Sequence, residues 1–468
     1  MSTPARVIPL KPVAADGQTP LLTPRLKIHP RSTTGRYTRW RWALVWLTQA
    51  VFYGLPWLPW NGRPAVLFSL ETQRFYLFDL VLVPQDMVFL SGLLVFCALL
   101  LFFVTALAGR LWCGFACPQT VYTEMFIWLE AHFEGERAAR QRLDAAPWSA
   151  AKLARRGGKH LAWTALSLWT GISFVAWFTP MRELLPALLA GSAGWYAFWA
   201  LVYGGFTYLN AGLLREQVCR HMCPYARFQG SMLDPDSHVV GYDRQRGEPR
   251  GHRARGENAA ARGQGACVDC TLCVQVCPAG IDIRAGLQSE CISCGVCVDA
   301  CDAVMDKLGD ARGLIRFDSQ RRFDGQPAPA RRWRVPVYGA LLLGVGSALA
   351  AGLVMRSPVR VDLMRDRGVM AREAEPGWVE NVYRVRLTNA SEHAWRLQAR
   401  VQGLDGAEVL GAGAIELAPA GEHTLPLSVR APVLADGERV RTIRLVFEPA
   451  EGSAGPRVEE ASTFLMPR

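Results

Sequence analysis

The chain has 468 residues, 50% of them hydrophobic, and a formal net charge of +11 at pH 7. This length is greater than that of one ordinary domain, and the hydrophobic residues gather in stretches that a soluble protein does not tolerate. The positive charge lies in the loops between these stretches, and no RNA- or DNA-binding motif accompanies it, which excludes a nucleic-acid-binding protein.

Residues 1–39 are basic and rich in proline, and they lack the apolar core of a signal peptide. We expect them to form a disordered cytoplasmic tail. Five apolar stretches follow, and each is close to the length that crosses a bilayer. They lie at about 42–58, 88–108, 161–178, 195–214 and 335–355. A buried helix of a soluble domain is the alternative for any single stretch, but five together predict a membrane protein.

Lysine and arginine predict the orientation of the five spans, because cytoplasmic loops carry an excess of both. Residues 1–41 contain eight of them, residues 110–159 another eight, and residues 215–334 eighteen. The alternate loops together contain only three arginines. These counts place the amino terminus and both basic segments in the cytoplasm. The segment 357–468 then lies outside, in the periplasm if the inner membrane of a Gram-negative bacterium is the location.

Two C-x3-C-P motifs lie at the cytoplasmic ends of the second and fourth predicted spans. We call their thiols the C-x3-C-P cysteines: Cys113, Cys117, Cys219 and Cys223. A C-x3-C pair on one helix would place both sulfurs on the same face, one turn apart. If the two helix ends are neighbours, four thiolates could converge on Cu(I), zinc or an iron–sulfur centre, with His221 and Met222 as further ligands. Packing as small hydrophobic side chains and a thiol–disulfide relay are the alternatives.

Other polar side chains of the predicted membrane domain give weaker signals. Glu124, Glu130 and His132 could guide a metal or a proton, or they could form the solvated face of an interfacial helix. Cys97 stands alone within the second predicted span, where we expect it to serve packing. Haem b is disfavoured because the predicted spans contain no histidine. No G-x-G-x-x-G sequence follows a predicted strand, so we expect neither a nucleotide nor a flavin.

Eight further cysteines form two copies of the spacing C-x2-C-x2-C-x3-C. Three close thiolates of one copy hold one [4Fe–4S] cluster, and the fourth cysteine of each copy ligates the other cluster. The first cluster set is therefore Cys267, Cys270, Cys273 and Cys301. The second cluster set is Cys291, Cys294, Cys297 and Cys277. Zinc or a disulfide framework is the alternative, but zinc sites rarely repeat this spacing twice. Two clusters imply electron transfer in a reducing compartment.

The segment 357–468 predicts β-structure. Apolar and polar residues alternate at 383–388, 395–401, 424–429 and 442–447, and turn residues separate these runs. Several short alternating strands at this spacing predict a small β-sandwich. We expect it to dock a partner, with a purely structural role as the alternative.

The predicted fold is thus a multi-domain membrane protein. It combines an α-helical bundle of about five spans, an inserted ferredoxin-like domain for two [4Fe–4S] clusters and an immunoglobulin-like β-sandwich. The predicted order is a tail (1–39), a four-span membrane domain (40–230), the cytoplasmic ferredoxin-like domain (231–334), a fifth transmembrane helix (335–356) and the periplasmic sandwich (357–468).

Four sequence stretches are distinctive when they occur together. They are PWNGRPAVLF at 59–68, WCGFACPQTV at 112–121, CPYARFQ at 223–229 and YDR with RGEPR at 242–250. With the double cluster motif and the Ig-like tail, they resemble the FixG/CcoG/RdxA family, the accessory proteins for assembly of cbb-type cytochrome c oxidase. The resemblance runs from about residue 35 to the end. Ferredoxin-plus-C-x3-C-P sequences are also similar to the membrane ferredoxins NapH and NosR.

The resemblance implies an inner-membrane oxidoreductase that reduces Cu(II) to Cu(I) for the haem–copper centre of the oxidase. The C-x3-C-P cysteines would be the catalytic groups, where copper binds or electrons leave. The implied partners are the lipid bilayer, oxidase subunits or a copper chaperone or transporter, and an electron donor that the sequence does not identify; a homo-oligomer is also open. A quinol-linked electron conduit of the NapH kind and a non-enzymatic scaffold that docks oxidase subunits are the alternatives.

Overall fold

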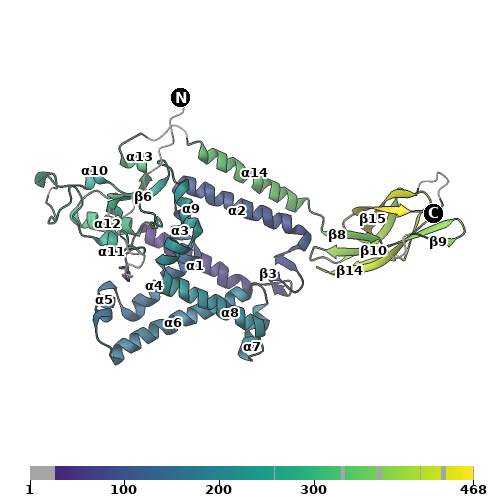
Figure 1. Ribbon diagram of the computed structural model, residues 1–468, viewed down its shortest axis with the longest axis horizontal. Coiled ribbons are helices and arrows are strands. Elements are labelled where there is room, and N and C mark those ends of the chain that lie inside the picture. Colours follow the sequence, from purple (N-terminus) through teal and green to yellow (C-terminus); the bar gives the residue numbers. More distant parts are fainter. Residues whose placement is uncertain are drawn as a thin grey trace. The chain divides into compact units, whose positions relative to one another are not determined.

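The computed structural model of the chain divides into two compact units (Figure 1). The helical unit comprises the described residues up to Leu58 together with Gly92–Ser347. The sandwich unit comprises Pro59–Ser91 and the described residues from Ala348 onwards. The structure describes residues 27–257, 259–327, 332–365, 371–411, 413–433 and 439–466.

The helices follow one another through short connections. Up to the cluster region they are α1 (Arg36–Gly54), α2 (Met87–Ala108), α3 (Leu111–Phe115), α4 (Pro118–Glu134), α5 (Arg137–Ala145), α6 (Ala150–Val175), α7 (Met181–Leu189), α8 (Gly194–Thr207) and α9 (Pro224–Met232). The π-helical turns η3 (Tyr208–Leu214) and η4 (Val218–Met222) join α8 to α9. The later helices are α10 (Arg244–Gly247), α11 (Leu272–Gln275), α12 (Val296–Leu308), α13 (Gln320–Phe323) and α14 (Arg334–Val354).

Two helices among the described residues are long and apolar enough to cross a membrane, namely Pro84–Ala108 and Arg334–Val354. They match the second and fifth predicted spans. Met181–Leu189 and Gly194–Leu214 add a third candidate only if this pair, bent by 93°, forms one span. The first and third predicted stretches lie in α1 and α6, whose amino-terminal halves also carry lysine or arginine.

Helix α6 packs against both α4 and α8 (Figure 1). Two glycines bring α6 and α8 close together. A Cβ atom on Gly171 would lie 2.0 Å from the carbonyl oxygen of Ala200, and one on Gly204 would lie 2.9 Å from that of Ser167. Small residues permit such backbone approach, which stabilises helix pairs in membranes through van der Waals contact. Helix α6 thereby supports α4, which begins within the first C-x3-C-P motif.

The segment before α1 is ordered where the structure describes it. His29 is buried and its Nε2 lies 2.8 Å from a carboxylate oxygen of Asp144. The backbone N–H of Arg31 donates to the carbonyl oxygen of Gln275 at 2.9 Å. The prediction of a disordered tail over 1–39 is therefore wrong for residues 27–39, because polar groups there find partners far along the chain. Residues 1–26 lie outside the described residues.

A two-stranded antiparallel sheet closes the cluster region. Strand β6 (His238–Tyr242) pairs with β7 (Ile315–Ser319), so the two ends of the segment with the eight cluster cysteines lie side by side. Buried cysteines share one hydrophobic core with apolar side chains such as Val240, Met305 and Leu314. The cysteines are therefore part of the interior of this region.

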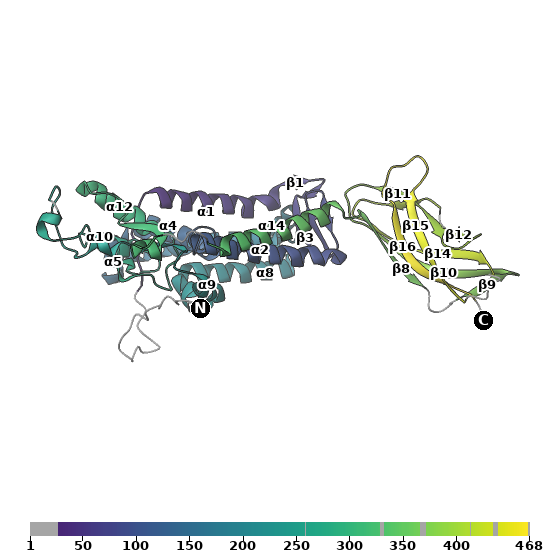
Figure 2. The same ribbon diagram turned by 90° about the horizontal axis from the view of Figure 1, so that it is seen from above.

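The sandwich consists of two antiparallel sheets (Figure 2). One sheet has the order β12-β14-β10-β8 with β9 paired to β10, and the other has the order β13-β11-β15-β16. The strands are β8 (Val359–Arg365), β9 (Arg372–Glu375), β10 (Trp378–Asn389), β11 (Trp395–Gln402), β12 (Glu408–Leu410), β13 (Ile415–Leu417), β14 (Glu422–Pro432), β15 (Val440–Pro449) and β16 (Val458–Leu465). The four predicted alternating runs lie in β10, β11, β14 and β15, which confirms the predicted β-sandwich.

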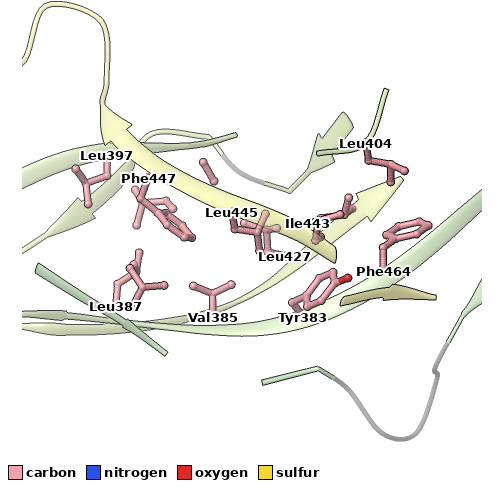
Figure 3. Packing of buried hydrophobic residues seen from close by; sticks show 14 of the residues in the cluster. Tyr383, Val385, Leu387, Leu397, Leu404, Leu427, Ile443, Leu445, Phe447 and Phe464 are labelled. Carbon is pink, nitrogen blue, oxygen red and sulfur yellow. The ribbon is translucent and has the colours of Figure 1, made fainter. Parts of the chain in front are cut away.

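The core of the sandwich lies between its sheets. Tyr383 and Leu387 of β10 point toward the space that Leu445 and Phe447 of β15 fill from the other sheet (Figure 3). The hydroxyl group of Tyr383 donates to the carbonyl oxygen of Thr463 at 2.9 Å. The period of two along each strand therefore places one face in the core and the other in solvent.

Residues 59–91 form small sheets that belong to the sandwich unit. Their strands are β1 (Pro59–Trp60), β2 (Arg63–Pro64), β3 (Val66–Ser69), β4 (Arg74–Leu77) and β5 (Leu80–Leu82). The carboxylate of Asp86 is almost fully buried, and it accepts hydrogen bonds from Arg356 at 3.1 Å and from Arg360 at 2.5 Å. The sequence-based boundary, which put these residues in the membrane domain, is wrong because it could not show such ion pairs.

Candidate metal centre

The second cluster set lines one internal cavity. Its four cysteines face this space together with apolar side chains such as Val240, Ile281 and Ile283. Burial raises the pKa of Cys277 to about 12, and the charges of Cys294 and Cys291 act in the same direction. Four thiols around one apolar space fit a [4Fe–4S] cluster, because each of the four irons takes one cysteine.

The first cluster set is also brought together. Burial raises the pKa of Cys301 to about 12, and the charges of Cys273, Cys267 and Cys270 add to the rise. Cys267 and Cys273 belong to one buried core, and Cys301 packs against it. Cys301 belongs to α12, whereas the other three belong to the first copy of the motif. The structure therefore brings Cys301 into the same core as cysteines of the first copy, and the division of the eight cysteines into two interleaved sets stays a prediction.

The two copies of the cluster motif share an unusual backbone conformation. Asp269 and Thr271 in the first copy have φ values of 52° and 56°, and Ser293 and Gly295 at the equivalent positions have 52° and 74°. A non-glycine residue in this left-handed region costs about 1–3 kcal/mol, so the surrounding loop must enforce it. Alternation of this kind turns backbone N–H groups inward and favours an anion such as a thiolate-ligated cluster. Only Gly295 among these four residues indicates the left-handed conformation from the sequence, because glycine adopts positive φ readily.

Each C-x3-C-P pair spans a helix break. Cys113 lies in α3 and Cys117 is the N-cap of α4, with φ −63° and ψ 128°. Cys219 lies in η4 and Cys223 is the N-cap of α9, with φ −78° and ψ 110°. The prediction that each pair shares one helical face is therefore wrong, because the proline of each motif begins a new helix. The second cysteine instead stands at a helix N-terminus, whose partial positive charge favours a thiolate.

The two C-x3-C-P motifs lie against each other. The thiol of Cys113 donates to Oε1 of Gln229 in α9 at 3.3 Å. The hydroxyl groups of Tyr225 in α9 and Thr105 in α2 are hydrogen-bonded at 3.1 Å. Burial raises the pKa of Cys113 to about 12, and the charges of the other three C-x3-C-P cysteines contribute to the rise. The structure thus places the first C-x3-C-P motif against α9, which begins at the second motif.

The first motif also touches the loop of the second cluster set. A Cβ atom on Gly114 would lie 2.7 Å from the carbonyl oxygen of Ile292 and 2.9 Å from Cα of Cys294. A side chain at position 114 would therefore overlap with the backbone of the cluster loop. Gly114 follows Cys113 directly, so the C-x3-C-P cysteines and the second cluster set are neighbours in space.

Arg110 bridges the same two regions. Its guanidinium donates to the carbonyl oxygens of Cys291 at 3.3 Å and Ala226 at 2.8 Å, and its side chain is buried. Cys219 and Pro278 line a cavity of about 40 Å³ together with Ile292 of the cluster loop. A buried positive charge next to several thiolates offsets part of their negative charge.

No three His, Cys, Asp or Glu side chains within the described part of the chain are placed to hold a single metal ion. This finding applies to the C-x3-C-P cysteines and to the eight cluster cysteines alike. His221 and Met222 are exposed, Met222 with 58% of its surface accessible. A cluster keeps its ligating sulfurs farther apart than one ion does, because each sulfur binds a different iron.

Helix α1 is joined to the cluster region at its N-terminus. The carboxylate of Asp299 in α12 is buried, and it accepts from the backbone N–H groups of Tyr37 at 3.1 Å and Thr38 at 2.7 Å. It therefore caps α1 from a distant part of the chain. Further along α1, buried Arg41 forms an ion pair with Glu124 of α4 at 2.8 Å. These contacts tie α1, α4 and α12 together around the second cluster set.

Glu130 and its neighbours form a buried ion network. The Glu130 carboxylate lies 2.8 Å from Arg215, 3.2 Å from Arg140 and 3.7 Å from Lys159. Burial opposes ionisation, but Arg215 and Lys159 outweigh it and hold the pKa of Glu130 below its ordinary value. His132 stacks on an aromatic ring instead of joining a metal group. The alternative of a solvated face is therefore wrong for Glu130, whose ion pair with Arg215 holds the chain just before the second C-x3-C-P motif.

Three family models match this chain. A 4Fe-4S dicluster domain matches residues 214–320, and a 4Fe-4S binding domain matches residues 90–134. The Ig-like fold at the C-terminal of FixG matches residues 349–467. These matches show iron–sulfur domains joined to an Ig-like domain, and such clusters carry single electrons.

Relatives match over most of the chain. The nitrogen fixation protein FixG of Rhizobium meliloti (strain 1021) is 38% identical over 86% of this chain and 84% of its own length. The protein RdxA of Cereibacter sphaeroides is 36% identical over 93% of this chain and 92% of its own length. The crystal structure of a FixG-related protein from Vibrio parahaemolyticus covers 24% of this chain and 97% of that chain, with 23% identity and a TM-score of 0.20. On the evidence of the two full-length relatives, the chain belongs to the FixG/RdxA family of iron–sulfur proteins.

Proposed function

We propose that the protein is a membrane-bound iron–sulfur reductase that delivers electrons to Cu(II) and yields Cu(I) for the copper centre of a cbb-type cytochrome c oxidase. The observations that carry this proposal are two contacts, one between the two cluster sets and one between the second set and the first C-x3-C-P motif. Cys273 of the first cluster set lines the cavity of the second set, and Gly114 beside Cys113 touches the second set at Cys294. Soft thiolates at such neighbouring sites suit one-electron transfer to a metal that is soft in its reduced form.

The residues of the chain have distinct roles in this proposal. The first and second cluster sets hold one [4Fe–4S] cluster each, and bound clusters supply single electrons. Each Cu(II) ion accepts one electron, so an external two-electron donor such as a quinol gives up two electrons and two protons for every two copper ions. Buried Arg41 and Arg110 offset negative charge beside the second set, which favours the reduced state.

We further propose that the protein crosses the inner membrane several times, with the cluster region in the cytoplasm and the sandwich in the periplasm. Contacts within each unit support this orientation. Asp144 and Asp299 meet the segment 27–39, and the positive-inside rule assigns all of these residues to the cytoplasm. Asp86 and Arg356 meet within the sandwich unit, and the rule places both outside. Reporter fusions at the ends of the predicted spans test the orientation and the proposed number of five.

Anaerobic copper reduction tests the proposed reaction directly. Pre-reduced, desalted protein would be mixed with Cu(II), and Cu(I) would be followed with a selective chelator. We expect rapid Cu(I) formation by the wild-type protein and a large loss in a Cys219→Ser/Cys223→Ser variant that keeps its ferredoxin clusters. The Cys97→Ser variant is the matched control, because it removes a thiol outside all three groups.

The other outcomes of this assay are equally informative. Equal rates in the wild-type and double variants would place copper reduction away from the C-x3-C-P cysteines. No Cu(I) from either protein would overturn the reductase proposal. A scaffold role would then be favoured if cluster-ligand variants such as Cys270→Ser still supported oxidase assembly.

A second cavity favours a quinol as the electron donor. It has a volume of about 270 Å³ and lies between α1, α4 and the loops of the second cluster set. Its walls include Trp42, Trp128 and His132, with Pro278 and Val296 on the side of the cluster loops. Aromatic walls suit a planar quinol ring, and an imidazole can accept a proton as the ring is oxidised.

Reduction by a quinol analogue tests this second candidate. Oxidised protein would be mixed anaerobically with a water-soluble quinol, and bleaching of the cluster absorbance would be followed. We expect slower bleaching in a His132→Ala variant and unchanged bleaching by dithionite, which needs no binding cavity. If dithionite reduced the clusters but no quinol did, quinol would not be the electron donor. The proposal of copper reduction would be unaffected.

A further inference from the structure

The C-x3-C-P cysteines form an internal repeat with a shared local structure. In each copy the first cysteine lies before a helix break, the second caps the next helix, and proline occupies the first helical position. One copy supplies two thiols, and the two copies together supply four. Four thiols are the number that a [4Fe–4S] cluster requires.

Contacts on both sides of the second copy hold the first copy beside it. On the amino-terminal side, Gln119 donates to the carbonyl oxygen of Arg215 at 3.1 Å. On the carboxyl-terminal side, Arg110 donates to the carbonyl oxygen of Ala226 at 2.8 Å, and the thiol of Cys113 donates to Gln229 at 3.3 Å. The second pair of cysteines lies in sequence between these flanking contacts, so the structure brackets both pairs within one small region.

The family matches divide these four cysteines between two iron–sulfur models. The 4Fe-4S binding domain that matches residues 90–134 contains Cys97, Cys113 and Cys117 but none of the eight cluster cysteines. The dicluster domain that matches residues 214–320 contains Cys219 and Cys223 in addition to those eight. Cys97 is exposed in the middle of α2, away from the helix break. Each match therefore contributes one C-x3-C-P pair that its other cysteines do not account for.

We propose that the C-x3-C-P cysteines hold a third [4Fe–4S] cluster, with one thiolate on each iron. Helices α4 and α9 both begin at a C-x3-C-P cysteine, and their N-terminal partial charges favour an anionic cluster there. Arg110 adds a buried positive charge beside the same thiols. The contact at Gly114 puts the site next to the second cluster set, where it would extend the row of electron carriers toward the exposed segment at Met222.

A third cluster would change the role of copper at the C-x3-C-P cysteines. The proposal of this cluster does not depend on copper reduction. Copper would be a substrate reduced beside the third cluster, and its ions would not be held by the four thiolates. The third cluster could equally deliver electrons to another acceptor. Iron content and copper reduction therefore measure two separate properties of the protein.

Iron and sulfide analysis of anaerobically purified, full-length protein tests the third cluster. Three clusters predict about 12 irons and about 12 acid-labile sulfides per chain, against about eight of each for two clusters. We expect about eight in both a Cys113→Ser/Cys117→Ser and a Cys219→Ser/Cys223→Ser variant. The Cys97→Ser control should retain about 12. Mössbauer spectra of the wild-type protein provide a second count that needs no variant to fold.

The outcomes separate the third cluster from its alternatives. Both double variants should lose the same spectroscopic component while they retain the signals of the two ferredoxin clusters. About eight irons in wild-type protein, unchanged in the double variants, would overturn the proposal. One copper per chain that disappears in the double variants, together with about eight irons, would overturn it in favour of a thiolate copper site. Copper reduction that persists in variants with about eight irons would leave the third cluster standing and move copper elsewhere.

Discussion

The interiors of the sandwich and of the cluster region contain different kinds of side chain. The sandwich core contains apolar side chains such as Val385, Leu427 and Phe447, each fully buried, and no cysteine occurs in that segment. The core of the cluster region includes Cys267, Cys273 and Cys291 beside ordinary apolar residues. An apolar core obtains its stability from burial alone, whereas a thiol-rich core obtains part of it from the metal that the thiols bind.

The helical unit adds a third kind of interior. Glu130 and Arg140 are fully buried there as members of an ion network, and Asp86 is buried by arginines in the sandwich unit. Buried ion pairs contribute little net stability compared with apolar residues of similar size, but the loss of one partner is costly. The comparison therefore predicts which region each perturbation will damage.

Removal of iron should cause the largest difference in stability between the cluster region and the sandwich. Oxidative chelation of the clusters should unfold the cluster region, because binding energy at structural metal sites is folding energy, on the order of 10 kcal/mol for structural zinc. The sandwich should keep its thermal transition. Limited proteolysis followed by mass mapping would reveal cleavage within 231–334 before cleavage within 357–468. Simultaneous cleavage of both segments would show that the sandwich core depends on the clusters.

Truncation of a side chain in the sandwich core should destabilise the sandwich and leave the cluster region unchanged. Phe447→Ala leaves a cavity between the two sheets and should destabilise the sandwich by about 3–5 kcal/mol. Chemical unfolding followed by tryptophan fluorescence measures the change, while electron paramagnetic resonance should show unaltered clusters. Arg400→Ala, on the exposed side of β11, is the matched control and should have little effect. Loss of the cluster signals in the Phe447→Ala variant would show that the cluster region depends on a folded sandwich.

Removal of the central carboxylate should test the buried ion network. Glu130→Ala leaves Arg215 and Arg140 buried without their shared partner, and it should cost about 3–5 kcal/mol. Because the pKa of Glu130 is below its ordinary value, the stabilisation is complete at neutral pH and is lost as the pH falls through the acidic range. Thermal unfolding in detergent at several pH values measures both effects. An equal response in exposed Glu183→Ala would show that position 130 is not special.

Removal of the cap on α1 should have the smallest effect. Asp299→Ala leaves the backbone N–H groups of Tyr37 and Thr38 without their acceptor and should destabilise the start of α1 by about 1–2 kcal/mol. Hydrogen exchange of residues 36–40 measures this fraying. Asp306→Ala on the same helix is the control, because its partner Arg312 is at the surface. Unchanged exchange at α1 would show that packing alone holds this helix to the cluster region.

Local patterns were sufficient for several features of the fold. The alternation at 383–388 and 442–447 predicted strands because a half-buried sheet has a period of two, and β10 and β15 contain both runs. The apolar stretches 88–108 and 335–355 predicted two helices long enough for a membrane, which α2 and α14 provide. Such features depend on neighbours in sequence, so sequence alone reveals them.

Other features of the candidate site depend on residues far apart in the chain. The carboxylate of Asp299 caps a helix that begins at Arg36, and no local pattern announces a cap from position 299. The prolines of the C-x3-C-P motifs are a local signal, since each occupies the first position of a new helix. The burial of Glu130 is not visible in the sequence, because its three basic partners lie in different parts of the chain, in α5, in α6 and directly after η3.

The sequence by itself identified this chain as an iron–sulfur protein. The spacing of eight cysteines predicts two interleaved cluster sets, since three close thiols of one copy and the fourth cysteine of the other can hold each [4Fe–4S] cluster. Only the tertiary structure decided that Cys113 is hydrogen-bonded to Gln229 of α9 and that Gly114 lies against Cys294. The physical reason is that helix packing and buried hydrogen bonds set distances between residues that are remote in sequence.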